Sequence, residues 1–534
     1  MSQPQSRSSR PLPETVVDVE VAQVFASAVT VVELLESSLV AAVESLLLTL
    51  GIPDAASVTV HTAQSDASAD GPVAIRLNGH RVRYSHDLSS TLSHHLGSAP
   101  EDVHKDPDRA VEYLTLLTVE AIKARAALLL GGQQLEWYRH TLRTAGAQAA
   151  AESPYLERAL QLALGLSSSI ADIEAVGEAL ADSSNADEPE VLESVIQAVR
   201  QRDIEIRLPF GYLRQLTDNG EWTGQFKTLR ASLVQELGAP VPPFRFVFDE
   251  GLSPQDDDSP PSFCFRFNSL TTPPIRGLAL DEILVNETPK KLEASGIQGA
   301  ATINPTNGWL ATIVKSGHRQ TLEASRQTFW DARQFIILCL GEAIRRRCAL
   351  FLDRSVVEDL ILNLRRDAPR LVEWVSGLLS TAEITAVLRE LLDAQVPIGN
   401  VRKICDLLVD AERETGLAER VARVRAGLRR EITNRLSRAT SVLPAYLLDP
   451  PVVDLLERAS TSGLNEHDET AITDAVRSEL SALPRVTPPA IIATPNGRAP
   501  LLALLRDVFP RVHVTTFDEI APDVNVQPIA RISV

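Results

Sequence analysis

The chain has 534 residues, of which 44% are hydrophobic and only 5% are aromatic, and it carries a formal net charge of −18. This length is sufficient for several domains, because one domain usually takes about 100–200 residues. The acidic balance argues against general nucleic-acid binding, which needs a basic surface that displaces counterions, and against adsorption to an anionic membrane. We therefore expect a multidomain protein with partners other than nucleic acids.

The N-terminal region shows no targeting or membrane-spanning signal. Residues 1–14 are rich in Ser, Pro and Arg without an apolar core, so we expect a flexible arm rather than a signal peptide. The apolar run Val21–Val32 has 12 residues, whereas a membrane span takes about 20. We predict no transmembrane segment, recovery in the soluble fraction, and a cytoplasmic location that is peripheral to the inner face of the membrane only through partners.

Two amino-acid types that often bind metals are present without a suitable pattern. The four cysteines form no C-x-x-C pair: Cys264, Cys339, Cys348 and Cys405. Buried free thiols are the expected state, rather than disulfides or a zinc site. Five histidines lie close together in the sequence: His80, His86, His94, His95 and His104. No acidic or cysteine ligand at helical spacing completes a site, so we interpret this segment as a polar linker.

Two parts of the chain resemble each other and indicate a tandem duplication. Tyr113–Leu142 aligned on Phe335–Leu364 gives ten identities in 30 positions without a gap. Flanking pairs keep the same order: Leu50-Gly51-x-Pro53 with Leu237-Gly238-x-Pro240, Arg76-x-Asn78 with Arg266-x-Asn268, and Pro154-x-Leu156 with Pro369-x-Leu371. Convergent patterning of unrelated amphipathic helices is the alternative. The duplication predicts that both copies share one core fold.

The duplication sets the predicted domain boundaries, in a mixed α+β fold of several small α/β and helical subdomains. After the arm at 1–14, a degenerate copy of the core unit occupies 15–182, and a linker and helix occupy 183–202. The second copy is a first α/β subdomain at 203–352, interrupted at about 281–329 by an inserted small subdomain that the first copy lacks. A helical subdomain at 353–440 and a C-terminal α/β subdomain at 441–534 complete the chain.

Helical spacing predicts where some individual side chains lie. Apolar residues recur at helical spacing from Leu371 to Leu392, and we place Trp374 of this stretch in the core. The acid triplet Asp256–Asp258 lacks the alternation of a calcium loop and is interpreted as solvated. The acidic residues around His467 suit the first turn of a helix, where the dipole favours negative charge.

Common catalytic signatures are missing from the sequence. It contains no phosphate-binding loop, no G-x-S-x-G elbow, no H-E-x-x-H and no dinucleotide glycine fingerprint. We therefore predict that the protein is not an enzyme, and we assign no catalytic residue, no cofactor and no metal. An unrecognised hydrolase is the least favoured alternative.

Four segments in one order resemble the cytoplasmic region of the export-gate family of flagellar and type III secretion systems, FHIPEP. They are Leu229–Phe246, Leu340–Arg354, Ile384–Leu408 and the C-terminal strand–helix–strand pattern that ends in Thr516–Ile532. In the last segment, Glu519-Ile520-Ala521-Pro522-Asp523-Val524 is similar to the family's E-I-P-P-D-V. The resemblance covers about residues 203–534 and does not include the family's membrane half, so it implies no pore or proton conduction by this chain.

The resemblance also implies a binding site for partner proteins. Family members form rings and dock export chaperones with their cargo at a groove between the first subdomain and the insert, beside a D-P-x-[FY]-G loop. The matching positions are Asn304, Pro305, Asn307 and Gly308, followed by Trp309. The turn residues are kept, but the acid is Asn304 and the aromatic is Asn307. Trp309 is either a replacement contact or a core residue.

A second stretch of the family's groove also differs in this sequence. The family's T-H-L-S-E reads Leu338-Cys339-Leu340-Gly341-Glu342 and has lost its threonine and histidine. The resemblance therefore implies a platform for export chaperones, secretion substrates or export-apparatus components, and a homo-oligomeric ring as its assembly. The alternative is a regulatory or scaffold protein that keeps the fold without a secretion role.

Overall fold

The structure is a computed structural model that describes residues 14–25, 29–52, 55–63, 72–96, 102–183, 186–200, 203–217, 222–254, 260–305, 309–410, 416–437, 440–482, 490–506 and 508–534. Most of the predicted arm, the triplet Asp256–Asp258, and Asn307 and Gly308 lie outside the described residues. The chain separates into two compact units. Unit 1 is Met1–Arg83, Asp102–Gln201 and Asn268–Leu270; unit 2 is Tyr84–Glu101, Arg202–Phe267 and Thr271–Val534.

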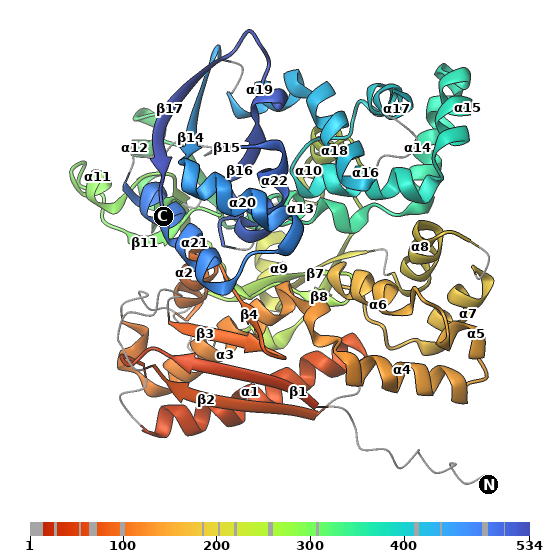
Figure 1. Cartoon of the computed structure of the whole chain (residues 1–534). Helices are drawn as coiled ribbons and strands as arrows, with labels where there is room; N and C mark the ends of the chain where they lie inside the picture. The colour runs from red at the N-terminus through yellow and green to blue at the C-terminus, as the bar shows by residue number, and fades with distance from the viewer. Residues whose placement is uncertain are drawn as a thin grey trace. The chain divides into compact units, whose positions relative to one another are not determined.

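Unit 1 is built on a four-stranded sheet with the order β2-β1-β3-β4 (Figure 1). Its strands are β1 (Glu14–Val21), β2 (Ala55–Thr62), β3 (Val73–Leu77) and β4 (His80–Val82). β1 runs parallel to β2 and antiparallel to β3, and the crossover is the helix α1 (Val29–Leu50). Every second residue of β1 is buried, and α1 buries a stripe at helical spacing from Val31 to Leu50, so the apolar pattern puts the core between sheet and helix.

Helices complete unit 1. α3 (Pro107–Ala124) packs on α1 and starts at Asp106, whose carboxylate accepts a hydrogen bond from the backbone N–H of Asp108 at 3.1 Å. The 3-10 helix η2 (Ala126–Leu129) follows. The remaining helices are α4 (Gly132–Thr144), α5 (Gln148–Ala151), α6 (Leu156–Gly165), α7 (Ile173–Asp182) and α8 (Glu188–Val199).

Unit 2 begins with a sheet of the same order, β6-β5-β7-β8, with β9 beside β7. Its strands are β5 (Ile204–Leu208), β6 (Phe244–Phe248), β7 (Ser262–Phe267), β8 (Leu270–Thr271) and β9 (Ile275–Arg276). β5 is parallel to β6 and antiparallel to β7, as β1 is to β2 and β3. The short helix α9 (Phe210–Thr217) and the long helix α10 (Trp222–Leu237) form the crossover.

The two repeats agree in backbone detail as well as in strand order. Gly51 and Gly238 both end the crossover helix at positive φ, 78° and 71°. After each glycine the chain meets a later segment in the same way: the N–H of Ile170 donates to the Leu50 carbonyl at 2.8 Å, and that of Ile398 to the Leu237 carbonyl at 2.9 Å. The structure thus confirms the predicted common core fold.

The helices of unit 2 repeat those of unit 1. α13 (Ala332–Arg346), η5 (Cys348–Phe351) and α14 (Arg354–Asp367) follow one another as α3, η2 and α4 do. Next come α15 (Pro369–Leu378), α16 (Thr381–Asp393), α17 (Val401–Val409), α18 (Leu417–Gly427) and α19 (Arg429–Leu436). α16 packs on η5 and α18 as α6 packs on η2 and α8. We infer that α8 belongs to the first repeat, which then reaches Val199 instead of residue 182.

The insert forms a separate antiparallel sheet within residues 282–331. Its elements are β10 (Glu282–Val285), α11 (Pro289–Glu293), β11 (Ala300–Ile303), β12 (Leu310–Lys315), α12 (Arg319–Ala324) and β13 (Phe329–Asp331). The strand order is β11-β12-β10-β13. Its small core includes Ile283, Leu292 and Leu322, all buried.

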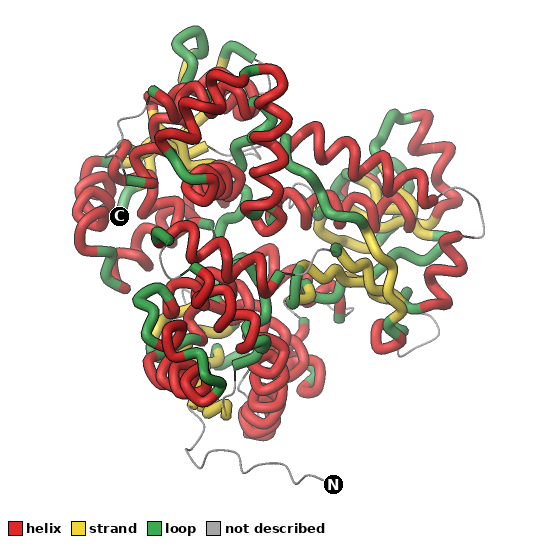
Figure 2. Tube along the Cα trace, turned by 90° about the vertical axis from the view of Figure 1, so that its right-hand side faces the viewer, coloured by secondary structure: helices red, strands yellow, loops and turns green. Residues whose placement is uncertain are grey.

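The C-terminal subdomain is a parallel sheet with the order β16-β15-β14-β17. Its elements are β14 (Val442–Leu448), α20 (Pro450–Ser462), α21 (Glu466–Ala482), β15 (Ala490–Ala493), α22 (Pro495–Leu505), β16 (His513–Thr516), η6 (Phe517–Glu519) and β17 (Asn525–Ile532). Figure 2 shows that helix is the commonest state along the chain, with strands gathered in separate small sheets. The mixed α+β class is therefore confirmed.

Three sequence predictions about the helical regions are wrong or need revision. Trp374 is not in the core: α15 buries Leu371, Val372 and Val375, and the indole lies outside this stripe with 62% of its surface exposed. The predicted alignment of Pro154 with Pro369 also fails. α6 of the first repeat corresponds to α16 of the second, and Pro154 precedes α6 whereas Pro369 starts α15. The continuous stretch from 371 to 392 is broken between α15 and α16.

The histidine-containing segment is not a polar linker. Residues His86–His95 form the helix α2, which is capped by Ser85 through a 3.2 Å hydrogen bond from the Leu88 N–H. Leu92 is fully buried, so one face of the helix is packed. The polar composition of the segment gave no indication of this face.

Other predictions about side chains are confirmed. All four cysteines are buried free thiols, and burial raises the pKa of Cys348 to about 12 and that of Cys405 to about 11. The acids near His467 lie in the first turn of α21, which Asn465 caps with a 2.8 Å hydrogen bond from the Asp468 N–H. Within the described residues, no single helix could cross a membrane by length and composition; one pair, α15 with α16, passes that test but is bent by 97°.

Candidate docking surface

The sequence-predicted loop lies in the β11–β12 hairpin of the insert. Pairing of Ile303 with Leu310 closes the two strands, and the N–H of Asn304 donates to the Trp309 carbonyl at 2.8 Å. The hairpin therefore fixes both ends of the loop, while residues 306–308 between them are outside the described part of the chain.

Asn304 anchors this loop to the body of the insert. Its side chain is 1% exposed and donates from Nδ2 to Oδ1 of Asn286 at 2.7 Å. A neutral amide suits this place, because a buried carboxylate facing another side-chain oxygen would be costly. The replacement of the family's acid is therefore compatible with a loop whose first residue points inward.

Pro305 and Trp309 are the described loop residues that reach the surface, and both are half-buried. The Pro305 carbonyl accepts a 3.0 Å hydrogen bond from Nη2 of Arg511, in the segment between α22 and β16 of the C-terminal subdomain. This bond ties the insert's hairpin to the C-terminal subdomain. The structure thus brings Asn304, Pro305 and Trp309 together at one hairpin end.

The second predicted stretch lies on α13, outside the insert. Cys339, Leu340 and Gly341 are buried in the core of the first subdomain, while Leu338 and Glu342 are half-buried. The Glu342 carboxylate accepts a 2.9 Å hydrogen bond from Nε of Arg346. The loss of threonine and histidine here leaves mainly packing groups instead of free polar contacts.

An aromatic pair that the sequence analysis did not single out is exposed in the first subdomain. Phe210 and Phe248 are 52% and 54% exposed, and their rings meet edge to face with centroids 5.1 Å apart. β6 is an edge strand, and its Phe residues at 244, 246 and 248 correspond in the first repeat to Ser57, Thr59 and His61. This difference between the repeats is the sequence signal that could have found the pair, because exposed aromatics are typical of interaction surfaces.

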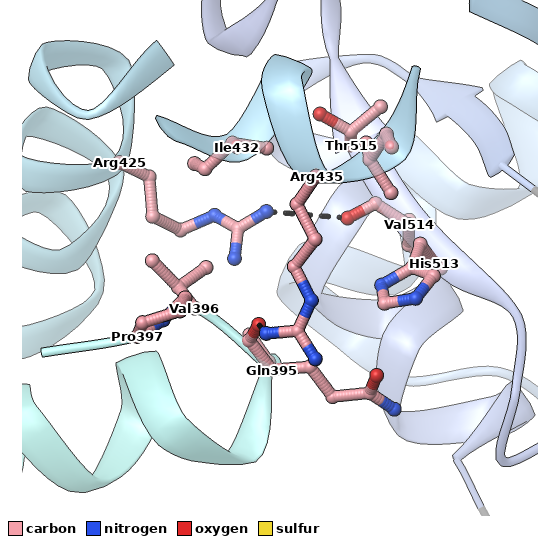
Figure 3. A pocket seen from close by; sticks show the side chains of 11 residues that line it. Gln395, Val396, Pro397, Arg425, Ile432, Arg435, His513, Val514 and Thr515 are labelled. Carbon is pink, nitrogen blue, oxygen red and sulfur yellow. Dashed lines mark hydrogen bonds between the residues drawn. The ribbon is translucent and has the colours of Figure 1, made fainter. Parts of the chain in front are cut away.

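A buried ion pair joins the helical and C-terminal subdomains beside a cavity of about 20 Å³ (Figure 3). Arg425 of α18 binds both carboxylate oxygens of Glu519, at 2.7 and 2.6 Å, and both side chains are at most 3% exposed. Its Nη2 also donates to the Val514 carbonyl, as the dashed line in Figure 3 marks. Nη1 of Arg425 is buried without a hydrogen-bond partner.

Charged side chains of the two subdomains contact one another at this junction. Burial would raise the pKa of Glu519, but hydrogen bonding and attraction from Arg425 and the nearby Arg498 hold that pKa below its usual value. Burial and the charges of Arg435 and Arg425 lower the pKa of His513 to about 4, so its ring is neutral at pH 7. Beside this cavity the Glu519 carboxylate is already bound by Arg425 through both of its oxygens.

Among the described residues, no group of three or more His, Cys, Asp or Glu side chains could hold a metal ion. The described surface offers a tethered hairpin, an exposed aromatic pair and several half-buried apolar side chains.

The chain is a multidomain α+β scaffold, in which a sheet–helix unit occurs twice and the second copy carries an inserted sheet. The FHIPEP family model matches residues 141–525, and the chain belongs to that family. Sequence relatives include the low calcium response locus protein D of Yersinia pestis, 23% identical over 314 residues, covering 57% of this chain and 44% of the relative. The flagellar biosynthesis protein FlhA of Bacillus subtilis is 25% identical over 383 residues, covering 69% and 55%.

Solved structures show the same fold. The Chlamydia pneumoniae CdsV protein matches with a TM-score of 0.55 and 22% identity, covering 62% of this chain and 98% of that one. The same protein in a complex with CdsO matches with a TM-score of 0.56, covering 62% and 97%. The chain spans about half the length of the curated relatives that it matches.

Proposed function

We propose that the protein is a non-enzymatic interaction platform of type III or flagellar protein export, which docks export chaperones, their cargo or other components of the export apparatus. The observation that carries this proposal is the hairpin end at Asn304–Trp309. It keeps the turn residues of the family's docking loop, and it is fixed at Asn286 and at Arg511. The described ends of the hairpin are therefore held in place before a partner binds, which reduces the entropy that they lose on binding.

Trp309 is the residue that we assign to the central contact. It is half-buried, so part of the residue is accessible to a partner. Tryptophan is among the residues most enriched at interface hot spots, where a fixed ring loses little entropy on binding. On this proposal Trp309 takes over the role of the aromatic that the family places at the position of Asn307.

The same proposal includes location and assembly. The protein would act in the cytoplasm next to the export apparatus, reach the membrane through its partners and assemble into a homo-oligomeric ring. The family membership supports this arrangement, and the complex of CdsV with CdsO supports the binding of a second protein to this fold.

Comparison of two tryptophan variants of the full chain tests the proposal. Trp309→Ala should weaken binding of a purified export chaperone with bound cargo by about 2 kcal/mol or more, because it removes a central aromatic contact. Trp374→Ala is the matched control, since Trp374 is 62% exposed on α15, away from the hairpin. Calorimetry gives the affinities and circular dichroism gives the melting temperatures. Equal affinities for both variants and the unchanged chain would rule out this docking site.

A second function is favoured by one observation. Asn304 is 1% exposed and its amide is engaged by Asn286, so the family's acidic contact has no counterpart on this surface. This change favours a regulatory or scaffold role that keeps the fold without a secretion role. Affinity capture from a native lysate distinguishes the two: export components among the captured proteins support the first function, and their absence beside other specific partners supports the second.

A further inference from the structure

Helix α2 comes from the first repeat in sequence but belongs to unit 2 in space. It lies between β4 and α3, at the place where the second repeat carries its insert, yet Tyr84–Glu101 clusters with unit 2. α2 packs against β9 of the first subdomain and against β11 of the insert. α2 therefore contacts both the first subdomain and the insert. Because β11 leads directly into Asn304, this contact lies beside the proposed docking loop.

The contacts of α2 are those of a docked helix. Leu92 and Ser93 are fully buried, and Ser89 and Ser90 are at most 7% exposed. The Nδ1 atom of His95 lies 3.1 Å from the hydroxyl of Ser262, the first residue of β7. Small serines around one leucine allow the helix backbone to approach closely, so α2 occupies this surface by packing as well as by the polar contact.

The character of these contacts suggests a helix that can leave the surface. The helix has only ten residues, and isolated helices of this length are marginal in water. Among its described side chains, Leu92 is the one large apolar group that is fully buried. A partner helix with more apolar side chains in the same place would bury more surface and displace α2.

We propose that α2 acts as an intramolecular cover of the docking surface between the first subdomain and the insert, and that it competes with an amphipathic helix of the partner. This inference rests on the proposed docking function and adds its regulation. The first repeat then has a role of its own, because it supplies a segment that limits access to the second repeat.

Release of α2 provides the first test. In the full chain, Leu92→Asp should detach α2 and raise the affinity for a purified export chaperone with bound cargo at least tenfold. Leu48→Asp is the matched control, because Leu48 is 81% exposed and belongs to α1. A synthetic peptide of residues 84–96, added in excess, should bind the Leu92→Asp chain and reverse the gain. Unchanged affinity, with faster amide exchange in α2 as proof of its release, would overturn the inference.

A covalent lock keeps the test independent of stability. His95→Cys combined with Ser262→Cys replaces the two groups that lie 3.1 Å apart, and the four native cysteines are buried. The oxidised chain should bind the chaperone–cargo complex at least tenfold more weakly than the same chain after reduction. Equal binding in both states overturns the cover while leaving the docking function intact. Absence of binding in every chain, the Leu92→Asp and reduced chains included, instead overturns the docking function and the cover with it.

Discussion

The Arg425–Glu519 ion pair provides a demanding test of how the subdomains of unit 2 are held together. In Glu519→Gln the carboxylate becomes a neutral amide of the same size, while the guanidinium of Arg425 stays 2% exposed and loses its counter-charge. Breaking a buried ion pair by removing one partner costs about 3–5 kcal/mol, because the remaining charge is desolvated without compensation. We expect a loss of this size at pH 7, since Arg498 lies 3.6 Å from Glu519 and loses the same partner.

The dependence on pH follows from the lowered pKa of Glu519. A carboxyl group with a depressed pKa in the folded state stabilises the fold above its unfolded pKa, near 4.5, and loses this effect as pH falls through the folded value. The difference in the free energy of unfolding between the unchanged chain and Glu519→Gln should therefore narrow below pH 4.5. The exposed pair Lys403–Glu431 supplies the control, because Glu431→Gln should cost less than about 1 kcal/mol.

Urea denaturation followed by circular dichroism measures these free energies. Two compact units can unfold in separate transitions, so amide exchange of β16 should identify the transition that belongs to the C-terminal subdomain. The double variant Arg425→Met with Glu519→Leu should recover much of the loss, because apolar groups of similar size leave no unpaired charge. The reasoning is refuted if Glu519→Gln costs no more than Glu431→Gln at pH 7.

Three further predictions concern single positions. Gly238→Ala should lower the free energy of unfolding by about 3 kcal/mol or more, because its φ is +71° and the new Cβ would lie 2.0 Å from the Gly399 nitrogen. The control is Gly463→Ala, at φ +75° with no neighbour within 4 Å, which should lower it by only about 1 kcal/mol in the same denaturation experiment. Burial lowers the pKa of His513 to about 4, so the fold is most stable above pH 6.5, where the ring is neutral in the folded and unfolded states, and becomes less stable as pH drops toward 4. His513→Asn should reduce this pH-dependent loss of stability by up to about 3 kcal/mol, and an unchanged slope of stability against pH would contradict the reasoning. The thiol of Cys348, buried and with a pKa of about 12, should react with a thiol reagent only in denaturant, and rapid labelling of the native chain would contradict its burial.

The repeat and the common fold of its two copies could be predicted because their signals are local. Gly51 and Gly238 mark helix ends at positive φ, and Asn78 and Asn268 mark turns at φ of 50° and 52°. These residues are fixed by backbone conformation, so they keep their identity and order while the side chains around them change. The structure shows the same strand order in both copies, β2-β1-β3-β4 and β6-β5-β7-β8.

Features that depend on tertiary packing were not predictable in the same way. Trp374 shares the helical spacing of Leu371 and Val375, but only the neighbouring helices decide which side of α15 is covered. The packed face of α2 consists of one leucine among serines, so its hydrophobic pattern is too weak to separate a docked helix from a linker.

The candidate site shows the same limit. The turn around Pro305 was predicted from its residues, whereas the inward side chain of Asn304 and the bond from Arg511 depend on segments 18 and 206 positions away. The acid Glu519 was recognised as part of a motif, but its burial against Arg425 requires the helical subdomain to be in place. Motifs thus located the residues, and only the fold assigned their contacts.

The first repeat closes its sheet and helices with a short connection between β4 and α3, where the second repeat carries the whole inserted sheet. The insert also has its own buried core around Ile283 and Leu322. The insert is therefore separable from the sheet–helix frame, because the first repeat has the frame without this module. On the proposed function, a change of partner requires changes in this module and leaves the parts that keep the protein folded as they are.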